Sequence, residues 1–251
     1  MKNRLYTEGY TIVLNDTMWN GRALMTARFK YEPHIKNWIY RNAPGKVFID
    51  VGASYGIHVL NAVRAGAEHV YAFEVLPEVY KCLLETVKLN SLQDKVTCYN
   101  VAIGDSEGES HLLKDIDDNG MMNWDNSGES GRKVPVKPLL GYLENLPPED
   151  TIFLMDVEGS EFKVMLGIAD YIKKYKPRIA FEILRFCFTK DEIADNIQWL
   201  SGIGYGFLLF DRPNQTGLVT NSVPELLNKI DEMKDGVMDI ELIPFCHCIK
   251  P

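Results

Sequence analysis

A strand, a glycine-containing turn and a helix follow one another over residues 46–65, and this unit constrains the fold of the chain most. Residues 46–56 read KVFIDVGASYG, in which a short apolar run predicts a buried strand and Gly52 and Gly56 frame a tight turn. Over residues 57–65 the apolar side chains recur at helical spacing. Small residues at such a turn allow a ligand to approach the backbone, and the first helical turn offers free N–H groups. The unit therefore predicts a ligand site at the end of a buried strand.

A second predicted strand ends in an acid, Glu74, roughly 20 residues beyond the turn. An ionised carboxylate only accepts hydrogen bonds, so it suits the two hydroxyls of a ribose and predicts an adenosine-containing ligand. The turn lacks the third glycine of the dinucleotide fingerprint, and Asp50 would repel a diphosphate. An acid at that place fits a ligand with a cationic end, such as the ammonium and sulfonium of S-adenosylmethionine.

Composition and charge favour one soluble enzyme domain. The chain has 251 residues, 46% of them hydrophobic and 25% charged, and no apolar stretch reaches the roughly 20 residues that span a membrane. The first ten residues hold no apolar signal core, so we expect a cytoplasmic protein. The formal net charge is −8, and Lys and Arg are dispersed among acids, which argues against a nucleic-acid partner.

The cysteines predict neither a disulfide framework nor a metal site. They are five, an odd number, at positions 82, 98, 187, 246 and 248. Cys246-His247-Cys248 resembles half of a zinc site, but zinc sites usually pair two such clusters and a second one is absent from the sequence. We therefore expect no metal site at these cysteines and favour metal-free general-base catalysis, with a metal-assisted mechanism left open.

Strand and helix patterns alternate along most of the chain. After a short hairpin pattern at 10–14 and helical material over 22–43 interrupted at Pro33, the expected strands are 46–51, 69–75, 95–103, 110–113, 151–157, 178–184, 205–210 and 238–248. The first of the expected helices after residue 46 begins at 56, and the later ones cover 77–90, 160–175, 190–203 and 223–234. This alternation predicts a mostly parallel sheet with helices on both faces. We expect a single domain, with residues 1–44 as an N-terminal hairpin and helical extension and 45–251 as the ligand-binding part.

One segment interrupts the alternation. Residues 114–133 are rich in Asp, Asn, Gly and Ser, with Met121, Met122 and Trp124 in the middle. Loops of this length without secondary structure are uncommon in compact domains, and many of them are lids. A solvated loop and a lid that closes over a substrate are both consistent with the pattern.

A second group of acids follows the later strands. Asp156 and Glu158 are two residues apart, so on an extended strand they face the same side, and Glu182 lies within the next strand. Carboxylates at neighbouring strand ends are costly to bury unless they bind a cation, a proton or donor groups. Glu161 fits the first turn of the following helix, where the helix dipole favours a negative charge.

The segments FIDVGASYG, AFE, MDVEGSE and PRIAFEI together resemble the FkbM family of S-adenosylmethionine-dependent methyltransferases, over about residues 46–185. The sequence departs from the family pattern at Ser54, where the family has Asn, and at Val75, where it has Pro. The resemblance implies a Rossmann-like class I methyltransferase fold, with a seven-stranded, mostly parallel sheet and an antiparallel final strand. It also implies O-methylation of a sugar or natural-product hydroxyl, with amide N-methylation among relatives.

The resemblance also assigns roles to residues. It implies that the methionine part of the cofactor is lined by Asp50, Gly52, Ala53, Ser54 and Gly56. Glu74 would hold the ribose, and the adenine would be flanked by Asn100, Val101 and Ala102. Asp156 would lie near the methionine ammonium or the acceptor.

The catalytic base is expected among Asp156, Glu158, Glu182 and His58. His58 begins the first helix, where the positive end of the dipole disfavours imidazolium and would leave a neutral base. The expected partner is a small-molecule acceptor, either a glycoside, a natural product or a peptide, and the oligomeric state is open. The alternatives are a peptide N-methyltransferase, an NAD-dependent oxidoreductase and a non-catalytic S-adenosylmethionine-binding subunit.

Overall fold

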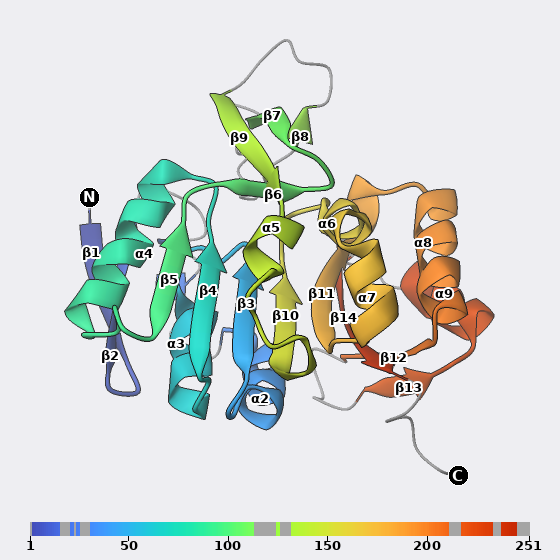
Figure 1. The fold of residues 1–251 in the computed structure, drawn as a ribbon, viewed down its shortest axis with the longest axis horizontal. Helices are drawn as coiled ribbons and strands as arrows, with labels where there is room; N and C mark the ends of the chain where they lie inside the picture. The colour runs from blue at the N-terminus through green and yellow to red at the C-terminus, as the bar shows by residue number, and fades with distance from the viewer. Residues whose placement is uncertain are drawn as a thin grey trace.

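An eight-stranded mixed sheet forms the centre of the computed structural model, which describes residues 2–15, 21–22, 24–25, 31–112, 124–125, 132–210, 217–232 and 237–244 (Figure 1). The strand order is β13-β12-β14-β11-β10-β3-β4-β5. The strands are β3 (Val47–Val51), β4 (His69–Phe73), β5 (Val96–Tyr99), β10 (Thr151–Met155), β11 (Ile179–Leu184), β12 (Tyr205–Leu209), β13 (Leu218–Thr220) and β14 (Val237–Pro244). Five neighbouring strands of this sheet, β5, β4, β3, β10 and β11, are parallel. β14 runs antiparallel to both β11 and β12.

The expectation of a mostly parallel α/β sheet with an antiparallel final strand is confirmed, but the count of seven strands is wrong. The extra strand is β13, which pairs with β12 at the edge of the sheet. It is three residues long, and such a run is too short to show an alternating pattern in the sequence.

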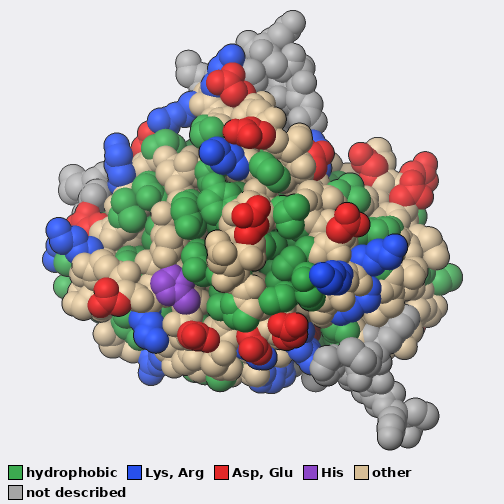
Figure 2. Space-filling view, viewed as in Figure 1, with side chains coloured by type: hydrophobic (Ala, Val, Ile, Leu, Met, Phe, Trp, Pro, Cys, Tyr) green, Lys and Arg blue, Asp and Glu red, His purple; other side chains and the backbone are tan. Residues whose placement is uncertain are grey.

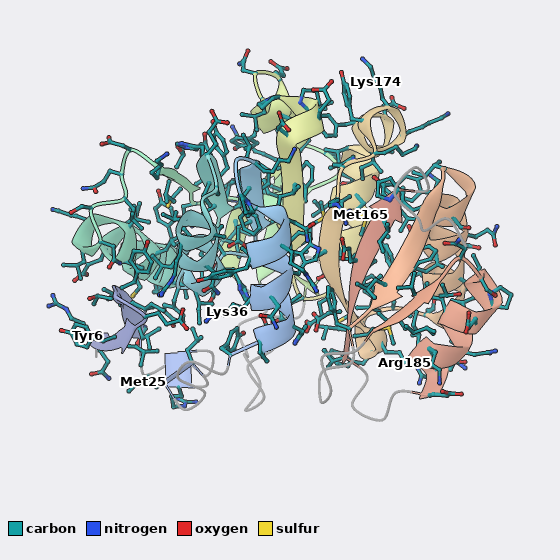
Figure 3. All side chains as sticks on the ribbon, turned by 90° about the horizontal axis from the view of Figure 1, so that it is seen from below. Tyr6, Met25, Lys36, Met165, Lys174 and Arg185 are labelled. Carbon is teal, nitrogen blue, oxygen red and sulfur yellow. The ribbon has the colours of Figure 1, made fainter. Side chains whose placement is uncertain are left out.

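Helices cover both faces of the sheet. They are α2 (Pro33–Asn42), α3 (Ile57–Ala65), α4 (Pro77–Leu89), α5 (Leu140–Leu143), α6 (Glu161–Gly167), α7 (Ala169–Tyr175), α8 (Lys190–Gly202) and α9 (Val223–Glu232), with short 3₁₀ turns at Pro148–Asp150 and Arg185–Cys187. Figure 3 shows Lys36 of α2 and Lys174 of α7 on opposite sides of the sheet. Among the described helices, none is long and apolar enough to cross a membrane.

Side-chain alternation along the strands builds one core on each face. Val47, Ile49 and Val51 pack with the apolar residues of α5 to α9, while Phe48 packs with α2, α3 and α4. Asp50 follows two residues after Phe48 and therefore faces the side of α2 and α3. The opposite face of the molecule carries α5 to α7. Figure 2 shows this face, with apolar side chains gathered at its centre and Lys and Arg scattered among acids.

A separate four-stranded sheet stands above the carboxyl ends of β4, β3 and β10 (Figure 1). Its order is β6-β9-β7-β8, formed by Ala102–Gly104, Arg132–Pro138, Gly108–Leu112 and Trp124–Asp125. The single strand expected over 95–103 is thus two strands in two sheets. The strand expected at 110–113 is confirmed as β7. Most of the loop or lid predicted over 114–133 lies outside the described residues.

The N-terminal hairpin is confirmed and packs on α4. It consists of β1 (Lys2–Thr7) and β2 (Tyr10–Asn15), and its turn has positive φ at Glu8 and Gly9. The backbone N–H of Val13 donates to Oγ1 of Thr86 (2.9 Å). Within 22–43 the structure assigns α2 only from Pro33, which begins this helix instead of interrupting one, because proline suits the first helical turn.

Two other boundaries differ from those predicted. The helix expected over 160–175 is divided into α6 and α7 at the buried Ile168, beside Gly167, where an added Cβ would lie 2.8 Å from the carbonyl oxygen of Gly104. The last strand ends at Pro244, and Cys246-His247-Cys248 lies outside the described residues. No three His, Cys, Asp or Glu side chains in the described part are placed to hold a metal.

Candidate functional site

The turn after β3 presses directly against the end of β10. Gly52 has φ +94°, and a Cβ there would lie 1.8 Å from the carbonyl oxygen of Asp156, so only glycine allows this approach. The backbone N–H of Asp156 in turn donates to the carbonyl oxygen of Val51 (2.9 Å). The two acidic motifs of the sequence, far apart along the chain, therefore meet at one edge of the sheet.

Glu74 joins the turns that follow β3 and β4. Its Oε2 accepts the N–H of Ser54 (2.9 Å) and its Oε1 accepts the N–H of Leu76 (2.7 Å). The side chain is buried, and burial raises the pKa of Glu74 to about 7. A carboxylate has about four acceptor sites. These contacts therefore orient Glu74 and leave it able to accept hydrogen bonds from a ligand.

Asn100 supports the same turn. Its side-chain amide donates to the carbonyl oxygens of Glu74 (2.7 Å) and Val75 (3.0 Å). The buried Val101 and Ala102 follow as the chain leaves the main sheet. Asn100 thus holds backbone, and a contact of residues 100–102 with adenine stays a prediction.

Asp50 is one of the most buried acids of the site. It is 2% exposed, and its Oδ2 has no hydrogen-bond partner among the described residues. Burial raises the pKa of Asp50 to about 7, although the nearby His58 opposes this effect. An ionised Asp50 without a ligand is therefore unfavourable.

Asp50→Asn is expected to stabilise the free protein at pH 8. The folded-state pKa of about 7 lies above the ordinary 3.8, so the folded protein retains a proton that the unfolded chain releases, and stability falls as pH rises through this window. That pKa difference corresponds to about 4 kcal/mol, against which an unpaired amide costs about 1–3 kcal/mol. We expect a net gain of about 1–3 kcal/mol in urea unfolding at pH 8, shrinking toward pH 4. A gain that does not vary with pH would contradict this account.

Asp156, Glu158 and Glu182 are close enough to perturb one another. Burial raises the pKa of Asp156 well above its usual range, and the charges of Glu182 and Glu158 add to the effect. Burial, with Glu32, raises the pKa of Glu158 to about 7. Glu158 and Glu182 thus lie near Asp156, and the expected place of the three acids beside an acceptor stays a prediction. The expectation that Asp156 and Glu158 share one side of an extended strand is wrong. β10 ends at Met155, and Glu158 has φ +53° in the following loop.

Glu161 shapes that loop. It is fully buried at the start of α6, as the sequence predicted, and its carboxylate accepts the N–H groups of Val157 (2.9 Å) and Gly159 (3.1 Å). Gly159 has φ +97° and lies against Cys187, where an added Cβ would be 2.6 Å from the Cys187 Cβ. The last acid of the DVEGSE segment therefore orients the first two.

Several site residues were not recognised in the sequence. Nε2 of His34 lies 2.7 Å from Oδ2 of Asp239, both buried, and Nε2 of His58 lies 2.8 Å from Oε2 of Glu32. The Tyr31 ring lies 6.0 Å from the His58 ring. Asp239 is opposite Glu182 in the β11–β14 register, a relation that no local pattern reveals.

The expectation of a neutral imidazole at His58 does not agree with these contacts. Burial opposes protonation, but the hydrogen bond and charge of Glu32, with the charges of Asp50 and Asp239, raise the pKa of His58 above its usual value. The acids around the ring thus outweigh the effect of burial on the pKa of His58. Its role as a base stays a prediction that this electrostatic setting disfavours.

The sequence model described as the methyltransferase FkbM domain matches residues 50–207, more than half of the chain and all of the acids above except Glu32 and Asp239. The chain belongs to the FkbM methyltransferase family. This FkbM-family chain is similar in fold to a solved FkbM methyltransferase from Methylobacillus flagellatus KT, with a TM-score of 0.50 and 16% identity, covering 79% of this chain and 44% of that one.

Curated relatives are similar over shorter stretches. The ribosomal protein L11 methyltransferase of Carboxydothermus hydrogenoformans is 40% identical over 55 residues, which is 22% of this chain and 18% of that protein. The probable protein arginine N-methyltransferase 6.1 of Oryza sativa subsp. indica is 34% identical over 111 residues, 44% of this chain and 28% of that protein. The FkbM-family chain thus matches less than a third of the length of either curated relative.

Proposed function

We propose that the chain transfers the methyl group of S-adenosylmethionine to a hydroxyl of a sugar or natural product. The observation that carries the proposal is a group of acids at or near the carboxyl ends of adjacent parallel strands within an FkbM domain, namely the buried Asp50, Glu74 and Glu182 and the partly buried Asp156. Ligands of open α/β sheets bind beyond these strand ends. A group of negative charges suits a cationic cofactor there.

The residues present fit S-adenosylmethionine. Oδ2 of Asp50 is a buried acceptor without a partner in the described part of the chain, and it suits the methionine ammonium. Gly52 keeps the turn free of a side chain, and Glu74 retains acceptor sites for two ribose hydroxyls. When bound, S-adenosylmethionine supplies a methyl group on a sulfonium, from which it leaves readily.

The chain's own task is to orient the acceptor and receive its proton. Orientation supplies on the order of 7–11 kcal/mol. A hydroxyl loses its proton as it attacks, and the carboxylates of Asp156, Glu158 and Glu182 are the proposed bases. The raised pKa values of Asp156 and Glu158 make these groups better proton acceptors than ordinary carboxylates. His58 is less suited, because its contact with Glu32 favours the protonated ring.

Calorimetric titration is the first test. S-adenosylmethionine and S-adenosylhomocysteine are expected to bind, and NAD and NADP are not, because the turn lacks the third glycine and carries Asp50. Binding of NAD without binding of S-adenosylhomocysteine would favour the oxidoreductase alternative and reject the methyltransferase.

The acceptor is found by incubating the protein with labelled S-adenosylmethionine and a panel of glycosides, natural-product alcohols and peptides. Mass spectrometry is expected to locate the label on a hydroxyl oxygen. Label on an amide nitrogen would replace the proposal with the N-methyltransferase alternative. Binding of S-adenosylhomocysteine with no labelled product in any class would favour a non-catalytic binding subunit.

A further inference from the structure

A carboxylate oxygen and an imidazole nitrogen lie buried and without hydrogen-bond partners on the two sides of the glycine turn. Oδ2 of Asp50 and Nδ1 of His58 make no hydrogen bond to any residue that the structure describes. The two residues are 2% and 8% exposed. Buried polar groups are nearly always paired, so each orphaned atom calls for a partner.

The two groups are neighbours, but they do not pair with each other. Asp50 lies at the end of β3 on the side of α2 and α3, and His58 is the second residue of α3. The glycine turn joins β3 directly to α3, so the two residues lie on the same side of the sheet, and each charge shifts the pKa of the other. A purely structural ion pair would bring Oδ2 and Nδ1 into contact, whereas both atoms are orphaned. A ligand that carries both charges would give each of the two atoms a partner.

Glu32 determines how the imidazole is presented. Its Oε2 lies 2.8 Å from Nε2 of His58, and this contact fixes the ring and favours its protonated form. In a protonated imidazole both nitrogens donate, so Nδ1 is a buried cationic donor. The first N–H groups of α3, a helix of nine residues, also favour an anion at this end. Glu32 is thus a positioning residue for His58.

We propose that Asp50 and His58 together bind the α-amino acid head group of S-adenosylmethionine, with the ammonium on Asp50 and the carboxylate on Nδ1 of His58. The inference rests on the proposed function and adds His58 and Glu32 to the cofactor site. It assigns His58 to binding of the cofactor instead of to proton removal.

Two ligands that differ only in this carboxylate provide the test. S-adenosylmethionine and decarboxylated S-adenosylmethionine are titrated by calorimetry into the wild type and into His58→Gln. The substitution is expected to weaken binding of S-adenosylmethionine about 10- to 100-fold, the range for a lost charge-assisted hydrogen bond, and to leave the decarboxylated ligand within about twofold. Asp50→Asn is expected to weaken both ligands, and neither variant should alter binding of 5′-methylthioadenosine, which lacks the head group.

Two further variants keep the test decisive. Glu32→Gln is expected to reproduce the selectivity of His58→Gln with a smaller loss, about three- to tenfold, because the ring remains but loses its charged partner. His69→Gln, in which the replaced ring contacts Thr97 at the far end of β4, is the matched control and should change neither affinity. Equal losses for both ligands, or no loss in His58→Gln, would overturn the inference while leaving the proposed function intact. A wild type that binds none of the three ligands would reject both.

Discussion

Glu74→Ala is expected to weaken binding of S-adenosylhomocysteine by about 100- to 10,000-fold, because two charge-assisted hydrogen bonds to ribose hydroxyls are lost at about 1.5–3 kcal/mol each. Removing the side chain also leaves the N–H groups of Ser54 and Leu76 without their acceptor. Glu74→Gln separates the two effects, since it preserves the size of the side chain and one acceptor oxygen. We expect it to retain most of the stability and still to bind at least about tenfold more weakly.

Glu78→Gln is the matched control for this measurement. Glu78 lies on α4, about half exposed, and pairs with Arg132 at 2.7 Å. Its loss should leave both affinity and thermal stability nearly unchanged, because exposed ion pairs contribute little. If calorimetry finds that Glu74→Ala binds S-adenosylhomocysteine as tightly as the wild type does, Glu74 does not contact the ribose.

Asp156→Ala and Glu182→Ala are each expected to reduce turnover at least about 100-fold, within the roughly 10²–10⁴-fold range of general acid–base groups. Two observations support a role of Asp156 as a base. Its backbone lies against the glycine turn, and burial and the charge of Glu182 raise its pKa. Turnover is measured as labelled product formed from the acceptor identified above. We expect Glu182→Ala to bind S-adenosylhomocysteine normally, since Glu182 is proposed for the acceptor side.

Glu144→Gln provides the control, because Glu144 is an exposed acid beside α5, and its turnover should stay at the wild-type level. A chelator is expected to have no effect on the wild type, since the proposed base is a carboxylate. Loss of turnover with chelator and recovery with Mg²⁺ would instead indicate a metal-assisted mechanism. Near wild-type turnover in both Asp156→Ala and Glu182→Ala would show that these acids are structural.

Local sequence patterns predicted most strands of the sheet, the glycine turn and the acids near the strand ends. Strands such as β3 and β10 are buried on both sides and show as short apolar runs, and Glu74 follows the second strand at a recognisable distance from the glycine turn. Boundaries failed where a tertiary contact ended an element. Asn100 bonds to the backbone of residues 74 and 75 as the chain leaves the main sheet, and Gly167 packs on Gly104 at the end of α6.

Residues close together along the chain were enough to predict the order of strands and helices, the glycine turn, the acids of the strand ends and the resemblance to the FkbM family. Only the tertiary structure brought Glu32 to His58 and Asp239 to His34, contacts between residues 26 and 205 positions apart. It also reversed the expected titration of His58, because the charge on a buried ring depends on the acids that surround it in space, and those acids come from separate elements of the fold.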